Sequence, residues 1–378
     1  MVDAERPLSR HRRATTLIAL AVIATAMASL IYVYSNKSPN PQGATESNDP
    51  LLVTRDYVTY TFTSATAGWA LDILPNTAPT PGQFAIFRTV DGGKHWQKTL
   101  TSEGEFFNYG AMPVQTVDAA HSFILVRGAT DVLYRTADGG AHWDKVTLPK
   151  PQVGEVAFSN SNYGWVLAWP DLYVTRDGGA SWQGLPGPPQ DASYRLSVRG
   201  PTEAWMSGAG SGSPHVYTSA DESQTWQRHD LPPPPGGSWS SSSFFPSLVQ
   251  LLPRTGVVVS DAYYGGAPSA MATSFDGGAT WRYVQPPPGT FAYQDAYHWW
   301  AIRGSVLSKS GDAGQTWRQV TNALPDWLFR PDLYVLDAKH AWVTMSVPAS
   351  SSAPGGNGLA FTDDGGLHWT RARVPRGG

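Results

Sequence analysis

The sequence contains no cysteine in its 378 residues. This absence excludes disulfides, thiolate metal sites, a cysteine nucleophile and the lipidated cysteine of a lipoprotein. Charge is also scarce, because only 15% of residues are charged and the net charge is −3. No basic stripe follows the first residues, so the electrostatic footprint of nucleic-acid binding is missing. No stretch after residue 50 shows a convincing helical period.

Glycine, proline and aromatic residues are plentiful in compensation. The chain has 38 glycines, 31 prolines and 12% aromatics, a composition that suits many short strands joined by many turns. Its hydrophobic fraction of 41% is enough to bury a core and argues against a disordered chain. The composition therefore indicates an all-β protein.

An uncharged apolar run covers residues 14–34 and follows four arginines, at positions 6, 10, 12 and 13. About 20 helical residues span a bilayer, and the positive-inside rule puts the arginines in the cytoplasm. We therefore expect a cytoplasmic N-terminus (1–13), a transmembrane signal-anchor (14–34), a linker (35–50) and an exported domain (51–378). Small residues around position 26 also resemble a cleavage site, so a cleaved signal peptide is the alternative.

One pattern, Ser/Thr-x-Asp-x-x-x-x-Trp, occurs seven times with its aspartates 36 to 55 residues apart. This spacing fits one propeller blade of four short strands per repeat. One blade cannot bury both of its faces, so the pattern predicts a single seven-bladed β-propeller. The aspartates are Asp91, Asp138, Asp177, Asp221, Asp276, Asp312 and Asp364.

A second repeat lies upstream of these boxes, where a turn residue is followed five positions later by an aromatic residue. Six of the seven predicted blades show it, and the fifth has Val257, Val258 and Val259 there instead. The aromatic residues are Trp69, Phe123, Trp165, Trp205, Trp300 and Trp342.

The box residues are typical of a hairpin turn. The aspartate can accept backbone N–H bonds across its own turn, and glycine two positions later takes positive φ without a Cβ clash. Equivalent residues of different blades lie far apart in a ring, so a structural role is expected rather than a catalytic or metal site. Glu222 and Ser223 replace the glycines of the fourth box, where the least regular turn is expected.

These boxes resemble the Asp-box (bacterial neuraminidase, BNR) repeat of sialidases, two-propeller xyloglucan hydrolases, sortilin-type receptors and photosystem II assembly factors. The element Gly68-Trp69-Ala70 together with Thr-x-Asp-Gly-Gly-x-x-Trp is most similar to the last group and its bacterial homologues. That resemblance implies a non-catalytic binding or assembly protein, because members of this group are regarded as such.

Glycoside hydrolysis, the chemistry of the sialidase relatives, needs two carboxylates about 5–10 Å apart. Asp171, Glu203, Asp261 and Asp295 lie near loops and are the candidates, although solvated turn residues are the simpler interpretation. The Arg-Ile-Pro element of sialidases is absent, and the histidines show no metal-ligand spacing. We therefore expect no catalytic residue, metal or cofactor.

Aromatic residues outside both repeats have no evident role in blade packing, so they are candidates for a binding face. We expect a membrane-anchored, extracytoplasmic scaffold for a protein or peptide partner; a glycan-binding or sialidase-like glycan-hydrolysing propeller is the alternative, and a sensor domain is a third. The candidate binding residues are Trp169, Trp239, Phe244, Phe245, Tyr263, Tyr264, Trp299 and Trp327.

Overall fold

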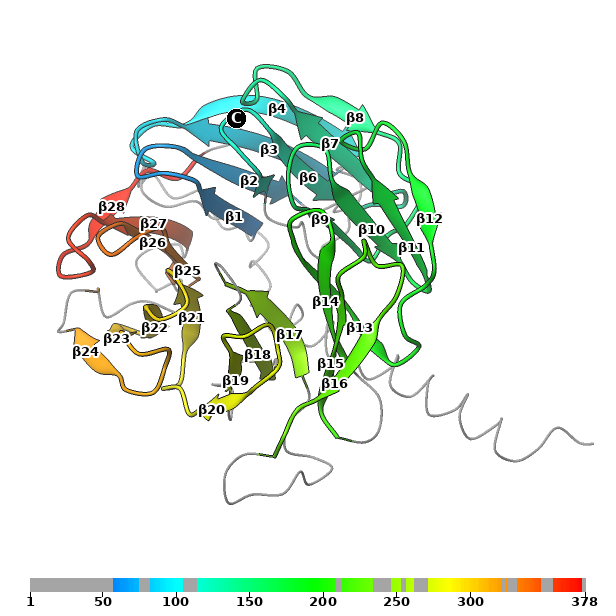
Figure 1. The fold of residues 1–378 in the computed structure, drawn as a ribbon. Helices are drawn as coiled ribbons and strands as arrows, with labels where there is room; N and C mark the ends of the chain where they lie inside the picture. Colours follow the sequence, from blue (N-terminus) through cyan, green and yellow to red (C-terminus); the bar gives the residue numbers. More distant parts are fainter. Residues whose placement is uncertain are drawn as a thin grey trace, which may run out of the picture. The chain divides into compact units, whose positions relative to one another are not determined.

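The structure is a computed structural model (Figure 1). It describes residues 57–74, 82–104, 114–208, 213–233, 246–252, 256–261, 271–320, 324, 332–347 and 356–375. The expected cytoplasmic segment, signal-anchor and linker all lie outside these ranges. Within them, no helix has the length and apolarity that a membrane crossing requires.

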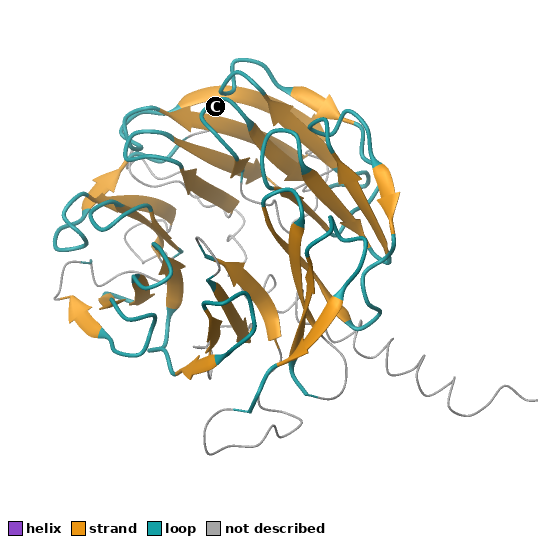
Figure 2. Ribbon diagram, in the orientation of Figure 1, coloured by secondary structure: helices purple, strands orange, loops and turns teal. Residues whose placement is uncertain are grey.

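The described residues form 28 strands in seven sheets, each an antiparallel meander of four consecutive strands. The sheets follow one another around a central axis in chain order (Figures 1 and 2). The predicted all-β, seven-bladed propeller with four-stranded blades is therefore confirmed.

The strand bounds by blade are as follows. Blades 1 and 2 contain β1 (Tyr57–Phe62), β2 (Gly68–Leu74), β3 (Gly82–Thr89), β4 (Gln97–Gly104), and β5 (Gln115–Thr116), β6 (Ser122–Val126), β7 (Val132–Thr136), β8 (Asp144–Val146). Blades 3 and 4 contain β9 (Glu155–Phe158), β10 (Gly164–Ala168), β11 (Asp171–Thr175), β12 (Gln183–Leu185), and β13 (Ala192–Arg199), β14 (Glu203–Gly208), β15 (His215–Ser219), β16 (Gln227–Asp230). Blades 5, 6 and 7 contain β17 (Pro246–Leu251), β18 (Val257–Asp261), β19 (Met271–Ser274), β20 (Arg282–Val284); β21 (Thr290–Tyr293), β22 (Trp299–Arg303), β23 (Val306–Ser310), β24 (Arg318–Val320); and β25 (Leu333–Val335), β26 (Ala341–Val347), β27 (Gly356–Thr362), β28 (Thr370–Ala372).

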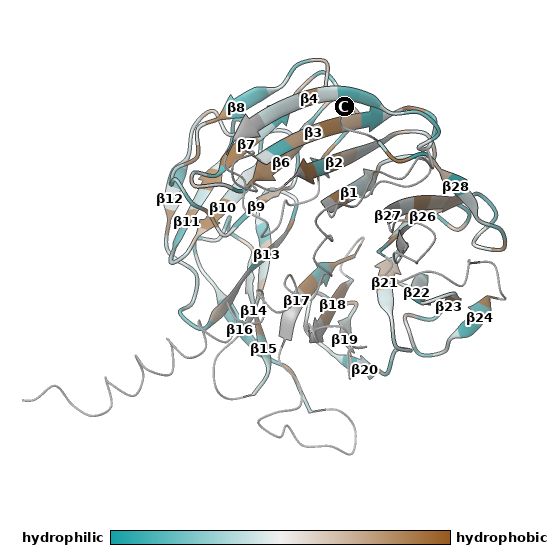
Figure 3. Ribbon diagram, turned by 180° about the vertical axis from the view of Figure 1, so that it is seen from behind, coloured by the Kyte–Doolittle hydropathy of each residue, from teal (hydrophilic) through white to brown (hydrophobic). Residues whose placement is uncertain are grey.

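The hydrophobic core is divided among seven clusters, one in each seam, by which we mean the packed contact between two neighbouring blades. Middle strands supply most of the buried residues, and the outermost strands β8, β12 and β20 are coloured as hydrophilic in Figure 3. This distribution follows from the architecture, because both faces of a blade are buried while its outer edge meets solvent.

The ring closes without a shared strand, since blade 1 uses β1 to β4 and blade 7 uses β25 to β28. Phe62 and Trp342 stack across this seam with ring centroids 3.8 Å apart. The indole N–H of Trp342 donates to the Gly92 carbonyl at 3.2 Å, and that of Trp96 donates to the Arg373 carbonyl at 2.8 Å. Side-chain packing and hydrogen bonds therefore join the first blade to the last.

Each meander has two ends, and they differ in chemistry. One end carries the hairpin between the first and second strands and the box turn between the third and fourth; we call it the turn face. The other end carries the loop between the second and third strands and the connection to the next blade; we call it the loop face. Chain direction assigns every site residue below to one of these faces.

Candidate functional site

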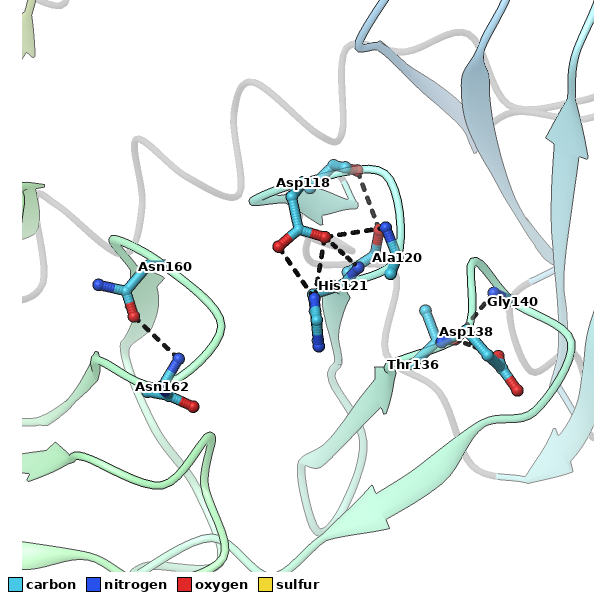
Figure 4. A network of polar contacts seen from close by, with 10 residues as sticks. Asp118, Ala120, His121, Thr136, Asp138, Gly140, Asn160 and Asn162 are labelled. Carbon is cyan, nitrogen blue, oxygen red and sulfur yellow. Dashed lines mark hydrogen bonds and ion pairs between the residues drawn. The ribbon is translucent and has the colours of Figure 1, made fainter.

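In the box turns on the turn face, the aspartate and the Ser/Thr hydroxyl form hydrogen bonds within their own turn. In blade 2, Asp138 Oδ1 accepts hydrogen bonds from the Thr136 hydroxyl and the His142 backbone N–H, both at 2.9 Å. The Gly140 N–H donates to the Thr136 hydroxyl at 2.8 Å (Figure 4). All seven boxes repeat these three bonds. The aspartates thus act as turn-forming residues.

The hairpins beside the boxes are built in the same way. Asp118 Oδ1 accepts the backbone N–H groups of Ala120 and His121, both at 2.8 Å (Figure 4). The Gly139 N–H of the box then donates to the Ala120 carbonyl at 2.8 Å, which ties the two turns together. Histidines pair with these aspartates, yet no group of three His, Cys, Asp or Glu within the described ranges is arranged to hold a metal ion.

The fourth box corrects an expectation. Glu222 and Ser223 adopt positive φ values of 62° and 66°, the conformation that the glycines take elsewhere. The Ser223 N–H still donates to the Ser219 hydroxyl at 2.9 Å, and Thr225 N–H still donates to Asp221 at 3.0 Å. The expected irregular turn is therefore wrong, since the hydrogen bonds hold two non-glycine residues in a strained conformation.

Trp299, one of the candidate binding residues, belongs to a seam. It is 0% exposed and packs with Val258, Met271 and Val284 between blades 5 and 6. Its neighbour Trp300 packs in the next seam, between blades 6 and 7. Trp299 therefore fills the space that the missing aromatic residue of blade 5 leaves at Val258, and it is unavailable to a ligand.

Trp169 is the candidate aromatic residue that stays on the loop face. It follows β10 and is half-buried against the core of the seam between blades 3 and 4. The other candidates lie outside the described residues or have no described side chain, and they stay predictions: Trp239, Phe244, Phe245, Tyr263, Tyr264 and Trp327.

The three candidate carboxylates whose side chains the structure describes do not converge. Asp171 lies on the loop face of blade 3 and pairs with Lys150 at 3.1 Å. Glu203 lies on the turn face of blade 4, where the Trp205 indole N–H donates to it at 2.7 Å. Asp295 lies in a turn-face hairpin of blade 6 and accepts backbone N–H bonds there. The side chain of Asp261 is outside the described part of the chain.

A polar group that the repeats do not mark lies on the loop face beside Trp169. Glu155 begins β9 and accepts the Leu196 backbone N–H of blade 4 at 2.8 Å. Burial raises the pKa of Glu155, and the Leu196 N–H and the charges of Arg195 and Arg127 offset only part of that rise. Arg127 is fixed in turn, because its guanidinium donates to the carbonyls of Val153, at 3.0 Å, and Gly154.

The same face of blade 4 carries a second polar group around Asp191. The Tyr217 hydroxyl donates to Asp191, and the His215 Nε2 lies 3.1 Å from it. Burial works to raise the pKa of Asp191, but the bonds from Tyr217 and His215 outweigh it and the pKa is lowered. Burial and the Asp191 charge raise the pKa of Tyr217 to about 12. Arg228 lies 3.8 Å from Asp191 on the exposed side.

We call these residues the blade 3–4 cluster; they are Arg127, Glu155, Trp169, Asp191, Arg195, His215, Tyr217 and Arg228. It joins ionic groups of both signs to the half-buried indole of Trp169, whereas Tyr217 is buried in the core of the seam. The fold and this cluster define a propeller with a structural turn face and a chemically varied loop face.

No protein-family model and no curated protein sequence matches the chain. Among solved structures, the chain is similar to "YCF48 bound to D1 peptide", with 16% identity, a TM-score of 0.55, and coverage of 86% of this chain and 98% of that one. It is also similar to YCF48 from Cyanidioschyzon merolae, with 17% identity, a TM-score of 0.51, and coverage of 81% and 94%. The resemblance to photosystem II assembly factor-like propellers is thus confirmed at the level of the fold.

Proposed function

We propose that the protein is a non-catalytic scaffold that binds a protein or peptide partner through the blade 3–4 cluster. The observation that carries this proposal is that the half-buried Trp169 packs on the core of the seam between blades 3 and 4, on the face where hydrogen bonds hold charged groups of both signs. An aromatic anchor surrounded by oriented polar groups is typical of specific protein interfaces. A similar propeller, YCF48, has been solved bound to a peptide, which supports this class of partner.

The signal-anchor expected at residues 14–34 would keep such a scaffold at a membrane, with the propeller on the extracytoplasmic side. This location belongs to the proposal and rests on the arginines before the apolar run. Sequencing the N-terminus of the mature protein tests it, since an intact start supports an anchor and a start near Met27 or Ser29 contradicts one.

The binding proposal is tested by panning a phage-displayed library of linear peptides on the purified propeller. Arg195→Glu reverses an exposed charge in the blade 3–4 cluster, and Lys339→Glu reverses an exposed charge on the turn face. Peptides captured by the parent protein should lose at least about tenfold in affinity for Arg195→Glu, equivalent to about 1.4 kcal/mol, and bind Lys339→Glu normally. Equal effects of both variants, or no enrichment at all, would contradict the proposed surface.

Glycan hydrolysis is the second candidate, because Glu155 and Asp191 have pKa values pushed in opposite directions. Such a pair is what an acid and a base or nucleophile require. Turnover of aryl glycosides by the propeller, abolished by Glu155→Gln with folding intact, would replace the scaffold proposal. We expect no such turnover, since both carboxylates are already engaged by protein groups.

A further inference from the structure

Blade 1 differs from the other blades at its outer rim (Figure 1). All seven outermost strands begin directly after the box tryptophan. In blade 1 this strand, β4, has eight residues, whereas β8, β12, β20, β24 and β28 have three each and β16 has four. β4 therefore continues toward the loop face beyond the point where the outermost strands of the other blades end.

A proline follows the outermost strand closely in six blades, and blade 1 lacks it. It stands four to eight positions after the box tryptophan, at Pro149, Pro186, Pro232, Pro286, Pro325 and Pro375. The first proline after Trp96 is Pro113, seventeen positions later. Short edge strands and prolines protect a sheet edge against pairing with another chain. Six blades carry both kinds of protection, and blade 1 carries neither.

The outer edge of β4 has no partner strand within the described part of the chain. β4 pairs with β3 alone, and no backbone hydrogen bond from a described loop reaches its outer edge. The pairing with β3 is regular from Leu100 to Gly104, after a register shift at Thr99. In such a ladder every second residue directs its N–H and C=O away from the paired strand. Residues Leu100 to Gly104 thus offer an extended backbone edge at the rim.

The residues of this edge suit a second copy of the same edge. Charged residues often keep sheet edges apart, yet Leu100, Thr101 and Ser102 carry no charge. A two-fold axis through Ser102, perpendicular to the sheet, lays two such edges antiparallel and keeps matching faces together. Ser102 then stands opposite its own copy, and Thr101 stands opposite Glu103 of the partner subunit. No like charges oppose each other in this register.

We propose that two copies of the chain form a reversible dimer by antiparallel pairing of β4 along Leu100 to Gly104. Main-chain hydrogen bonds join the two blades into one continuous sheet, the mode in which extended segments add to open sheet edges. The contact is limited to one strand of each copy, which is less area than a permanent dimer buries. A dissociation constant of about 10–100 µM is therefore expected. The contact does not involve the blade 3–4 cluster.

The first measurement is sedimentation velocity of the full chain in mild detergent, from about 1 to about 200 µM. The parent protein should form more dimer as its concentration rises. Thr101→Pro and Ser102→Pro place proline five and six positions after the box tryptophan, where blade 5 and blades 2, 4 and 7 have it. Both should be monomeric, whereas Thr101→Ala keeps the backbone N–H and should dimerise like the parent.

Thermal unfolding of the two proline variants separates loss of pairing from loss of folding. Neighbouring residues of a strand direct their N–H groups to opposite edges. One proline therefore removes an outward N–H and should leave the melting temperature unchanged, while the other removes a bond to β3 and should lower it. The variant with the unchanged melting temperature carries the test.

The second measurement uses the absence of cysteine from the chain. Directly opposed Cα atoms of antiparallel strands lie about 4.5–5.5 Å apart, a separation that a disulfide can span. Gln183→Cys places a control thiol on the exposed strand β12, which Pro186 follows. Under mild oxidation Ser102→Cys should form a disulfide-linked dimer at least about tenfold faster than Gln183→Cys, because pairing raises the local thiol concentration.

Three results would each overturn the proposal. A parent protein that stays monomeric at the highest concentration would leave the β4 edge to a strand from a different protein. Dimers that persist in the stably folded proline variant would place the contact elsewhere, such as in the apolar run at residues 14–34. Equal oxidation rates for Ser102→Cys and Gln183→Cys would show that β4 does not pair with its own copy.

Discussion

The seam between blades 5 and 6 offers a quantitative test of which side chain fills the packing position beside the box glycine. In the seams between blades 1 and 2 and between blades 4 and 5, the second strand of the earlier blade sends a tryptophan side chain against a box glycine of the later blade. A Cβ on Gly140 would lie 2.5 Å from Trp69, and one on Gly278 would lie 2.8 Å from Trp205. In this seam a Cβ on Gly314 would instead lie 2.5 Å from Trp299, a residue of the same blade.

Trp299→Ala should therefore destabilise the propeller by about 3–5 kcal/mol, the usual result of emptying a buried tryptophan site. Val258→Trp alone should also destabilise it, by about 1–3 kcal/mol, because the space is already filled. The double variant places alanine at the position that Ala204 and Ala341 hold in blades 4 and 7, and tryptophan at the position that Trp205 holds in blade 4. It should recover at least half of the loss caused by Trp299→Ala.

The assay is urea unfolding of the four proteins, read by tryptophan fluorescence and far-ultraviolet circular dichroism. The coupling energy is the change in unfolding free energy of the double variant minus the sum of the changes in the two single variants. A coupling of about 2 kcal/mol or more in the favourable direction is expected. Additive losses would refute the conclusion that Trp299 replaces the missing aromatic residue of blade 5.

Other positions give independent tests by the same unfolding measurement. Ser223→Gly should stabilise the protein by about 1 kcal/mol, because it removes the left-handed strain of Ser223 and a buried hydroxyl without a described partner. These two gains outweigh the conformational entropy that glycine adds to the unfolded chain. Gly140→Ser, the reverse change in the second box, should destabilise the protein. Hydrogen bonds from the Thr225 hydroxyl and N–H, and then from Ser219, lower the pKa of Asp221 from 3.8 to about 2. A lowered folded-state pKa means stability that is present above pH 4 and lost as the pH falls toward 2, so urea midpoints should drop across that window and drop less in Asp221→Asn. Trp342→Ala should expose the backbone amides of blades 1 and 7 to hydrogen exchange before those of blades 3 and 4, because their seam closes the ring without a shared strand.

The repeats made the fold predictable because each box encodes its turn with neighbouring residues. Thr136, Asp138 and Gly140 make all their defining bonds within five positions of one another. Blade number and strand order then follow from counting such turns. No comparable repeat marks Trp299, because Trp300 occupies the repeat position and the strand register alone places Trp299 in the other seam.

The blade 3–4 cluster was not predictable for a different reason. Glu155 lies on β9, Asp191 in the turn before β13 and His215 on β15. Between Ala192 and Leu196 the pairing of β13 with β14 has a bulge-like register shift. A bulge has no repeat signature, and neither does a charged residue at a strand end. Trp169 was identified because a large aromatic residue outside a repeat is rare enough to notice.

The difference between the two faces bears on where function resides in this propeller. On the turn face, every box aspartate is occupied by its own turn, so changes there act first on folding. On the loop face, connections vary from two-residue links, such as Trp169 and Pro170 between β10 and β11, to the six-residue connection between β12 of blade 3 and β13 of blade 4. Loops that the repeat does not constrain can vary without cost to the blades. Partner selection should therefore respond to loop-face substitutions such as Arg195→Glu that leave the unfolding midpoint unchanged, and a box substitution that altered binding without altering stability would contradict this division.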